Sequence, residues 1–190
     1  MWSSWAEEDH VSIIPFDVGK EVKERFTDKT INELVKACFD MGEVKTGALI
    51  VIEQKNRLDE YIRTGINVDA VLSSQLLINI FEHNTPLHDG AVVMRGNRIV
   101  AATCYLPLSD NMMISKELGT RHRQAVGISE VTDSMTIVVS EETGRVSLVE
   151  GGSLRRIADA EMLKAALASM ERQEETGSSR FRIWKGKKEE

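Results

Sequence analysis

The chain has few cysteines and no long apolar run, and each shortage argues against a class of protein. Its two cysteines, Cys38 and Cys104, lie far apart and form no CxxC pair, so the sequence supports neither a zinc motif nor a redox motif. We expect two reduced, buried thiols in a cytoplasmic protein. No apolar run approaches the roughly 18–20 residues that cross a bilayer. The N-terminus, "MWSSWAEEDH", lacks the basic and apolar regions of a signal peptide.

An excess of positive charge is also missing. The formal net charge is -6, which disfavours a nonspecific nucleic-acid binder, because such proteins neutralise phosphates with a basic surface. The sequence contains neither a GxxxxGK[ST] loop nor a GxGxxG fingerprint, so neither a P-loop nor a dinucleotide-binding fold is indicated. The 190 residues are 42% hydrophobic and 28% charged, which is typical of one soluble globular domain.

Hydrophobic periodicity predicts helices and strands that alternate along the chain. Thr30 and Glu33 fit a capping box at the start of a helix that Gly42 can end. The other expected elements are a strand at Thr46–Glu53, a helix at Val71–Glu82, hairpins within 91–107 and 135–149, and a helix at Asp159–Gln173. This order predicts one α/β domain with a mixed central β-sheet of about five to seven strands flanked by helices.

We divide the chain into three parts. Residues 1–29 lack clear periodicity and form a lead-in, residues 30–173 form the domain, and residues 174–190 form a polar tail. No internal boundary and no repeat at a fixed period is visible.

The first candidate site is His88-Asp89-Gly90-Ala91, directly before an apolar strand. Asp and Gly are common in turns, so a simple turn explains the stretch when it is taken alone. A functional interpretation uses the same residues together. Asp89 offers oxygen to a hard cation or accepts a proton, His88 can ligate the same metal, and Gly90 lets a ligand approach the backbone.

The second candidate site is the basic start of a helix near Arg121, which Gly119 or Thr120 can cap. Arg121 and Arg123 fall in its first turn, where the helix dipole disfavours positive charge. A bound phosphate would resolve that conflict, since backbone N–H groups and guanidinium groups would act on it together. A solvated face with salt bridges is the alternative, and His122 between the arginines can be structural.

Two weaker signals lie at other strand ends. Ser140, Glu141 and Glu142 follow an apolar run, and one of these acids can complete a metal site with His88 and Asp89. Tyr105-Leu106 forms an aromatic and apolar lip that can hold a base. A hairpin turn and ordinary packing are the respective alternatives. Together the four signals suit a nucleoside triphosphate with a divalent metal.

Three long stretches resemble a known family, the diadenylate cyclase domain. They are "LHDGAVVMRGNRIVAATCYLPLS", "ISKELGTRHRQAVGISEVTDS" and "IVVSEETGRVSLVEGG", which carry the DGA and RHR motifs of that family intact. The similarity extends over roughly 31–157, and the tail looks like the end of the membrane-tethered bacterial subfamily.

The resemblance implies that two ATP molecules are condensed into cyclic di-AMP with release of two pyrophosphates. It implies a divalent ion, Mg²⁺ or Mn²⁺, and a homodimer in which two active sites meet face to face. Metal ligands would be His88, Asp89 and Glu142, and Asp89 would also help to deprotonate the attacking hydroxyl. The ATP-binding residues would be Gly90, Ala91, Tyr105, Leu106, Gly119, Thr120, Arg121, His122, Arg123 and Ser140, with Arg121 and Arg123 also acting in catalysis.

The resemblance also bears on partners and location. We expect no nucleic-acid partner, and membrane attachment only through a segment absent from this chain. The chain as given is expected in the cytoplasm, at the inner face of the membrane if the whole protein carries transmembrane helices. A catalytically silent nucleotide sensor on the same fold is the alternative function, and a nucleotidyltransferase with another acceptor is a further one.

Overall fold

The central β-sheet has seven strands, and a computed structural model of the chain describes it within residues 26–111 and 118–170. The strand order is β2-β4-β3-β1-β5-β6-β7. The strands are β1 (Ala48–Ile52), β2 (Ile66–Val71), β3 (Ala91–Arg95), β4 (Arg98–Cys104), β5 (Met135–Val139), β6 (Val146–Glu150) and β7 (Ser153–Ile157). β1 pairs with β3 in parallel and the other pairs are antiparallel, so the predicted mixed α/β sheet is confirmed.

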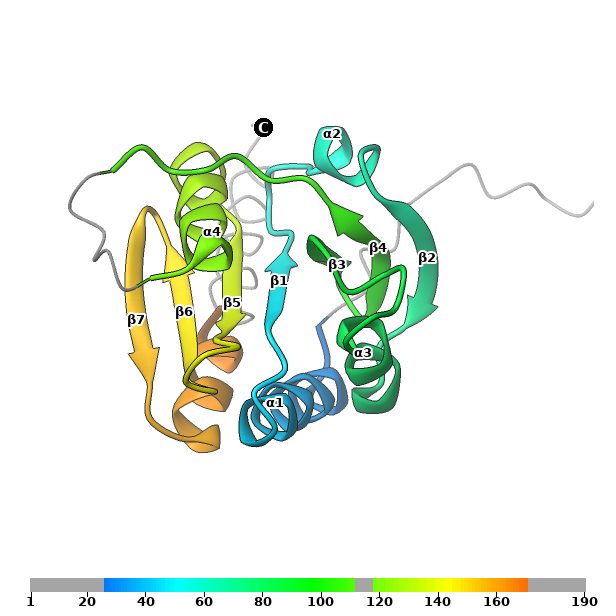
Figure 1. Cartoon of the computed structure of the whole chain (residues 1–190), viewed down its shortest axis with the longest axis vertical. Coiled ribbons are helices and arrows are strands. Elements are labelled where there is room, and N and C mark those ends of the chain that lie inside the picture. The colour runs from blue at the N-terminus through cyan, green and yellow to red at the C-terminus, as the bar shows by residue number, and fades with distance from the viewer. Residues whose placement is uncertain (1–25, 112–117, 171–190) are drawn as a thin grey trace, which may run out of the picture.

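Helices cover both faces of this sheet (Figure 1). They are α1 (Asp28–Glu43), α2 (Asp59–Ile62), α3 (Ser74–Phe81), α4 (Thr120–Val131) and a last helix whose described part spans 160–170. The expected lead-in, 1–29, falls almost wholly outside the described residues, and the expected tail, 174–190, lies entirely outside them. No helix in the described ranges has the length and apolar character that spanning a membrane requires.

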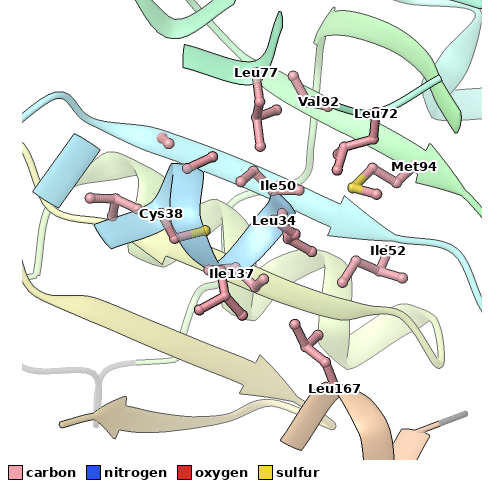
Figure 2. Close-up of a cluster of buried hydrophobic side chains, with 14 of the residues drawn as sticks. Leu34, Cys38, Ile50, Ile52, Leu72, Leu77, Val92, Met94, Ile137 and Leu167 are labelled. Carbon is pink, nitrogen blue, oxygen red and sulfur yellow. The ribbon is translucent and has the colours of Figure 1, made fainter. Parts of the chain in front are cut away.

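Two hydrophobic clusters hold these layers together, one on each face of the sheet. Alternate side chains of β1 divide between them: Ile50 belongs to the cluster under α1 and α3, and Leu49 to the cluster under α2 and α4. Figure 2 shows the first cluster, in which side chains of α1 and α3 gather with those of neighbouring strands; the labelled residues include Leu34, Cys38, Ile50, Leu77, Val92 and Ile137. β1 is buried on both faces, which explains its unbroken apolar sequence.

The start of α1 differs from the predicted capping box. The N-cap is Thr27, whose side chain accepts a hydrogen bond from the Thr30 backbone N–H. The hydroxyl of Thr30 instead donates to Asn97 Oδ1 at 2.6 Å, and the Glu33 carboxylate accepts the Ser74 N–H at the start of α3. That hydrogen bond lowers the pKa of Glu33. The two residues of the expected box therefore join α1 to the β3–β4 turn and to α3.

Both cysteines are buried and free, as the sequence predicts. Burial raises the pKa of Cys38 to about 12 and that of Cys104 to about 11. Because the thiolate is the reactive form, neither thiol should react with dithionitrobenzoate in the native protein, whereas both should react in guanidinium chloride. Absorbance of the released thionitrobenzoate measures this, and stoichiometric labelling of the native chain within minutes would contradict it.

Candidate active site

The first turn of α4 lies against the turn that follows β5. Gly119 is the N-cap of α4 and has no side chain to cap it, so the helix begins where the sequence predicts. Thr120 and Arg121 line a hollow together with Ser140 and Glu142 of the β5–β6 turn. We call it the phosphate hollow, after the ligand that the sequence predicts there; its lining residues are Gly119, Thr120, Arg121, His122, Val139, Ser140, Glu141 and Glu142. Predicted residues from two distant stretches therefore meet at one surface.

The β5–β6 turn is held in shape by Ser140. Its Oγ accepts hydrogen bonds from the backbone N–H groups of Glu142, at 3.3 Å, and Thr143, at 3.2 Å. Its carbonyl accepts from Gly144 N–H at 2.8 Å. The hairpin-turn interpretation of this stretch is correct, and the same turn presents the exposed side chains of Glu141 and Glu142 beside α4.

The two residues that follow Arg121 in α4, His122 and Arg123, have structural contacts as well. His122 is 7% exposed; burial lowers its pKa, Arg156 lowers it further, and Glu142 opposes them. Arg123 joins α4 to Ser109: its carbonyl accepts the Ser109 N–H at 3.0 Å, and its Nη2 donates to the Ser109 carbonyl at 3.4 Å. His122 therefore packs inward while lining the hollow, and Arg123 fastens the loop that precedes α4.

A second hollow adjoins the first and contains His88. We call it the His88 hollow; it is lined by Val44, Lys45, Thr46, Gly47, Phe81, Glu82, His83, His88, Arg121 and Glu141. His88 Nδ1 lies 2.6 Å from the Thr85 carbonyl, and its ring meets that of His83 edge to face with centroids 5.5 Å apart. With Nδ1–H donating to the carbonyl, Nε2 is left as the metal-binding nitrogen.

Arg121 and Glu141 line both hollows and are bonded to each other. Arg121 Nη1 donates to Glu141 Oε2 at 2.5 Å. Gly47 packs behind the pair, since a Cβ at Gly47 would lie 2.7 Å from Arg121 Nη1 and 3.0 Å from Glu141 Oε2. The sequence did not single out Glu141 within its acidic pair, and no motif pointed to Lys45, Gly47 or His83.

The turn before β3 presents Asp89 to solvent. Asp89 is exposed, and its side chain has no hydrogen-bond or ion-pair partner within 26–111 and 118–170. Gly90 follows with φ +102, and a Cβ there would come within 2.9 Å of the Thr103 Cα. The glycine is thus required by the backbone of β4. The stretch is a turn, as the simpler interpretation has it, and it leaves a free carboxylate at the surface.

The predicted adenine lip has one exposed and one buried side chain. Tyr105 is 78% exposed, and its backbone N–H donates to Thr64 Oγ1 at 2.8 Å. Leu106 is 5% exposed and, with Ala91, belongs to the core under α2 and α4. Any contact of Ala91 or Leu106 with a ligand must therefore be made by the backbone, whereas the Tyr105 ring is free to stack.

The predicted metal ligands are not gathered at one point. No group of three or more His, Cys, Asp or Glu side chains in the described part of the chain is close enough to hold one ion. His88 lines one hollow and Glu142 the other. The His88 Nε2 and the unpartnered Asp89 carboxylate still suit Mg²⁺ or Mn²⁺, because such ions take one or two carboxylates and fill their other positions with water and substrate phosphates.

Comparison with known proteins places this geometry in a family. The family model described as "DisA bacterial checkpoint controller nucleotide-binding" (DAC) matches residues 35–154, which include all the site residues named above. The chain is 54% identical over 167 residues to the cyclic di-AMP synthase CdaA of Bacillus subtilis and 52% identical over 168 residues to a diadenylate cyclase of Listeria monocytogenes. These alignments cover 87% and 88% of this chain but 61% and 62% of the relatives.

A solved structure is similar to this chain in both fold and sequence. The crystal structure of DacA from Staphylococcus aureus, a double cysteine mutant, superposes with a TM-score of 0.74 and is 50% identical. The match covers 75% of this chain and 95% of that one. The chain thus spans about three fifths of the length of these two curated relatives, and the match covers nearly all of the solved chain.

Proposed function

This chain belongs to the DAC family, and from that premise we propose that it is a diadenylate cyclase that converts two ATP molecules into cyclic di-AMP and two pyrophosphates. The observation that carries the proposal is the phosphate hollow, where the start of α4 and the β5–β6 turn bring Thr120, Arg121 and Ser140 together. A helix N-terminus with guanidinium and hydroxyl donors is a physical match for a triphosphate.

Binding of ATP and the chemical step are assigned to different residues of the site. Thr120, Arg121 and Arg123 hold the triphosphate with Ser140, and Tyr105 stacks on adenine. Asp89 accepts the proton of a ribose 3′-hydroxyl, whose oxygen attacks the α-phosphorus of the other ATP. A new P–O bond forms, the bond from the α-phosphorus to the β-phosphate oxygen breaks, and pyrophosphate leaves. The same exchange in the opposite direction closes the ring.

We propose Mg²⁺ or Mn²⁺ as the ion, held by His88 and Asp89, with Glu142 contributing when substrate is present. When bound, the ion supplies positive charge that offsets the charge developing on the phosphates. The contact of His88 Nδ1 with the Thr85 carbonyl supports this proposal, because it leaves Nε2 available to an ion.

We also propose that the active form is a homodimer. The described part of one chain carries the phosphate hollow and a single Asp89, whereas the proposed reaction needs two ATP molecules in opposite orientation. Two chains facing each other would place the acid of one beside the nucleotide of the other. We propose that the domain works in the cytoplasm, where ATP is available, and that any attachment to a membrane is made by other segments of the whole protein.

Incubation of the chain with ATP and either Mg²⁺ or Mn²⁺, followed by mass spectrometry, tests the function. We expect cyclic di-AMP and two pyrophosphates per product, with no product after chelation by EDTA and recovery when the ion is restored. Binding of ATP without turnover would instead identify a nucleotide sensor. A mixed adenylate adduct would identify a different nucleotidyltransferase.

A further inference from the structure

The Arg121–Glu141 ion pair forms the boundary between the two hollows. Both residues line the phosphate hollow and both line the His88 hollow. The Arg121 side chain is 21% exposed and therefore largely covered, whereas that of Glu141 is 62% exposed and has room to turn into solvent. Of the two, Glu141 is the partner that can move away without disturbing the core.

The same guanidinium is needed by the proposed substrate. A carboxylate oxygen and a phosphate oxygen are equivalent acceptors for an arginine N–H, so they compete for one donor. We propose that Glu141 is a positioning residue that holds Arg121 while no nucleotide is bound and is displaced when the triphosphate takes its place. This inference rests on the proposed function, because it takes ATP as the displacing ligand.

Displacement of Glu141 would join the two hollows. With the boundary open, His88 would share one continuous cleft with Thr120, Ser140 and Glu142. The triphosphate would thus replace the Glu141 carboxylate as the partner of Arg121 and complete the site in which it binds.

Gly47 offers a second way to test the same pair, because it lies beside both side chains. Its Cβ position lies 2.7 Å from Arg121 Nη1 and 3.0 Å from Glu141 Oε2, and both atoms are ends of flexible side chains. Gly47 does not have the left-handed backbone that an alanine would resist. Gly47→Ala should therefore shift the ion pair and leave the fold intact.

The test is the affinity of the full chain for α,β-methylene-ATP with Mg²⁺, measured by isothermal titration calorimetry. Glu141→Gln should tighten binding by about threefold to tenfold, because the competing carboxylate is lost while the side chain keeps its size. Glu161→Gln is the matched control: it removes the same charge from an exposed position outside both hollows and should change affinity by less than about twofold.

A double-mutant cycle distinguishes the effect of the Arg121–Glu141 pair on affinity from a general repulsion between Glu141 and the triphosphate. In a Gly47→Ala background the pair is already disturbed, so adding Glu141→Gln should change the affinity by less than about twofold. An unchanged affinity in the single Glu141→Gln variant, or a full effect in the Gly47→Ala background, would overturn the inference. An unaltered chain that binds no analogue would overturn both this inference and the proposed function. If the unaltered chain binds the analogue and Glu141→Gln does not change the affinity, only the inference about Glu141 is overturned.

Discussion

The Asp89→Asn variant should bind ATP within about threefold of the normal affinity and form cyclic di-AMP about a thousandfold more slowly, or not at all. Asparagine keeps the size of the side chain but neither accepts a proton nor offers a charged ligand to the ion. Asp89 is exposed and has no side-chain partner in the described structure, so its replacement should leave the free energy of unfolding unchanged. The loss would therefore be confined to the chemical step.

Two measurements check this expectation: calorimetric binding of ATP with Mg²⁺, and mass-spectrometric quantification of cyclic di-AMP over time. Asp40→Asn provides the matched control, because Asp40 is a carboxylate on the exposed face of α1 that pairs with Lys36. It should keep full activity. Normal product formation by Asp89→Asn would remove Asp89 from the mechanism, and loss of ATP binding would move its role from chemistry to substrate affinity.

The sequence predicted the interior of the fold better than its edges. Both hairpins were predicted, because an apolar run on each side of a turn residue has few other interpretations. β2 and β7, the outermost strands of the sheet, were missed. Their sequences, INVDAV and SLRRI, include charged residues and are largely exposed. Edge strands are paired on one side and tolerate such residues, so they lack the hydrophobic signal on which the prediction depends.

The candidate site shows a similar division. The acid–glycine turn and the basic helix start were visible because each breaks a local rule: an acid at a strand entry, and arginines at the positive end of a helix. Glu141 was not distinguished from Glu142, since both are exposed acids in one turn and only the three-dimensional contact with Arg121 separates them. Gly47 was invisible for the same reason, because its role depends on a side chain more than 70 residues away.

The packing of α4 links the two halves of the proposed nucleotide site. Gly127, in the middle of α4, lies directly against the backbone that follows Tyr105 and Leu106: a Cβ at Gly127 would be 2.1 Å from the Pro107 carbonyl oxygen and 2.9 Å from Ser109 N. The hydrogen bond between Ser109 N–H and the Arg123 carbonyl fixes the same contact one helical turn earlier. The proposed adenine lip and the proposed phosphate site at the start of α4 are thus held together through a helix that has no side chain at this point.

Gly127→Ala should therefore lower the free energy of unfolding by about 2 to 4 kcal/mol and the Tm by several degrees. The sign of this change in stability distinguishes a close backbone contact from an open helix position. In an open helix the same change stabilises by about 1 kcal/mol, because alanine has the higher helix propensity. Here the clashing atoms are backbone and cannot turn aside, so α4 and the 105–109 segment must separate. Thermal and urea denaturation followed by circular dichroism measure the effect.

Gln124→Ala supplies the control in the same helix. It also raises helix propensity, at a position that is only partly buried, and should change the free energy of unfolding by less than about 0.5 kcal/mol. If the Gly127→Ala variant folds, the KM for ATP should rise as well, because adenine and triphosphate would meet surfaces that no longer fit one nucleotide. A Gly127→Ala chain that is more stable than the original would show that α4 and the Pro107 backbone are not in contact. In that case the close approach would not be what aligns the two halves of the site.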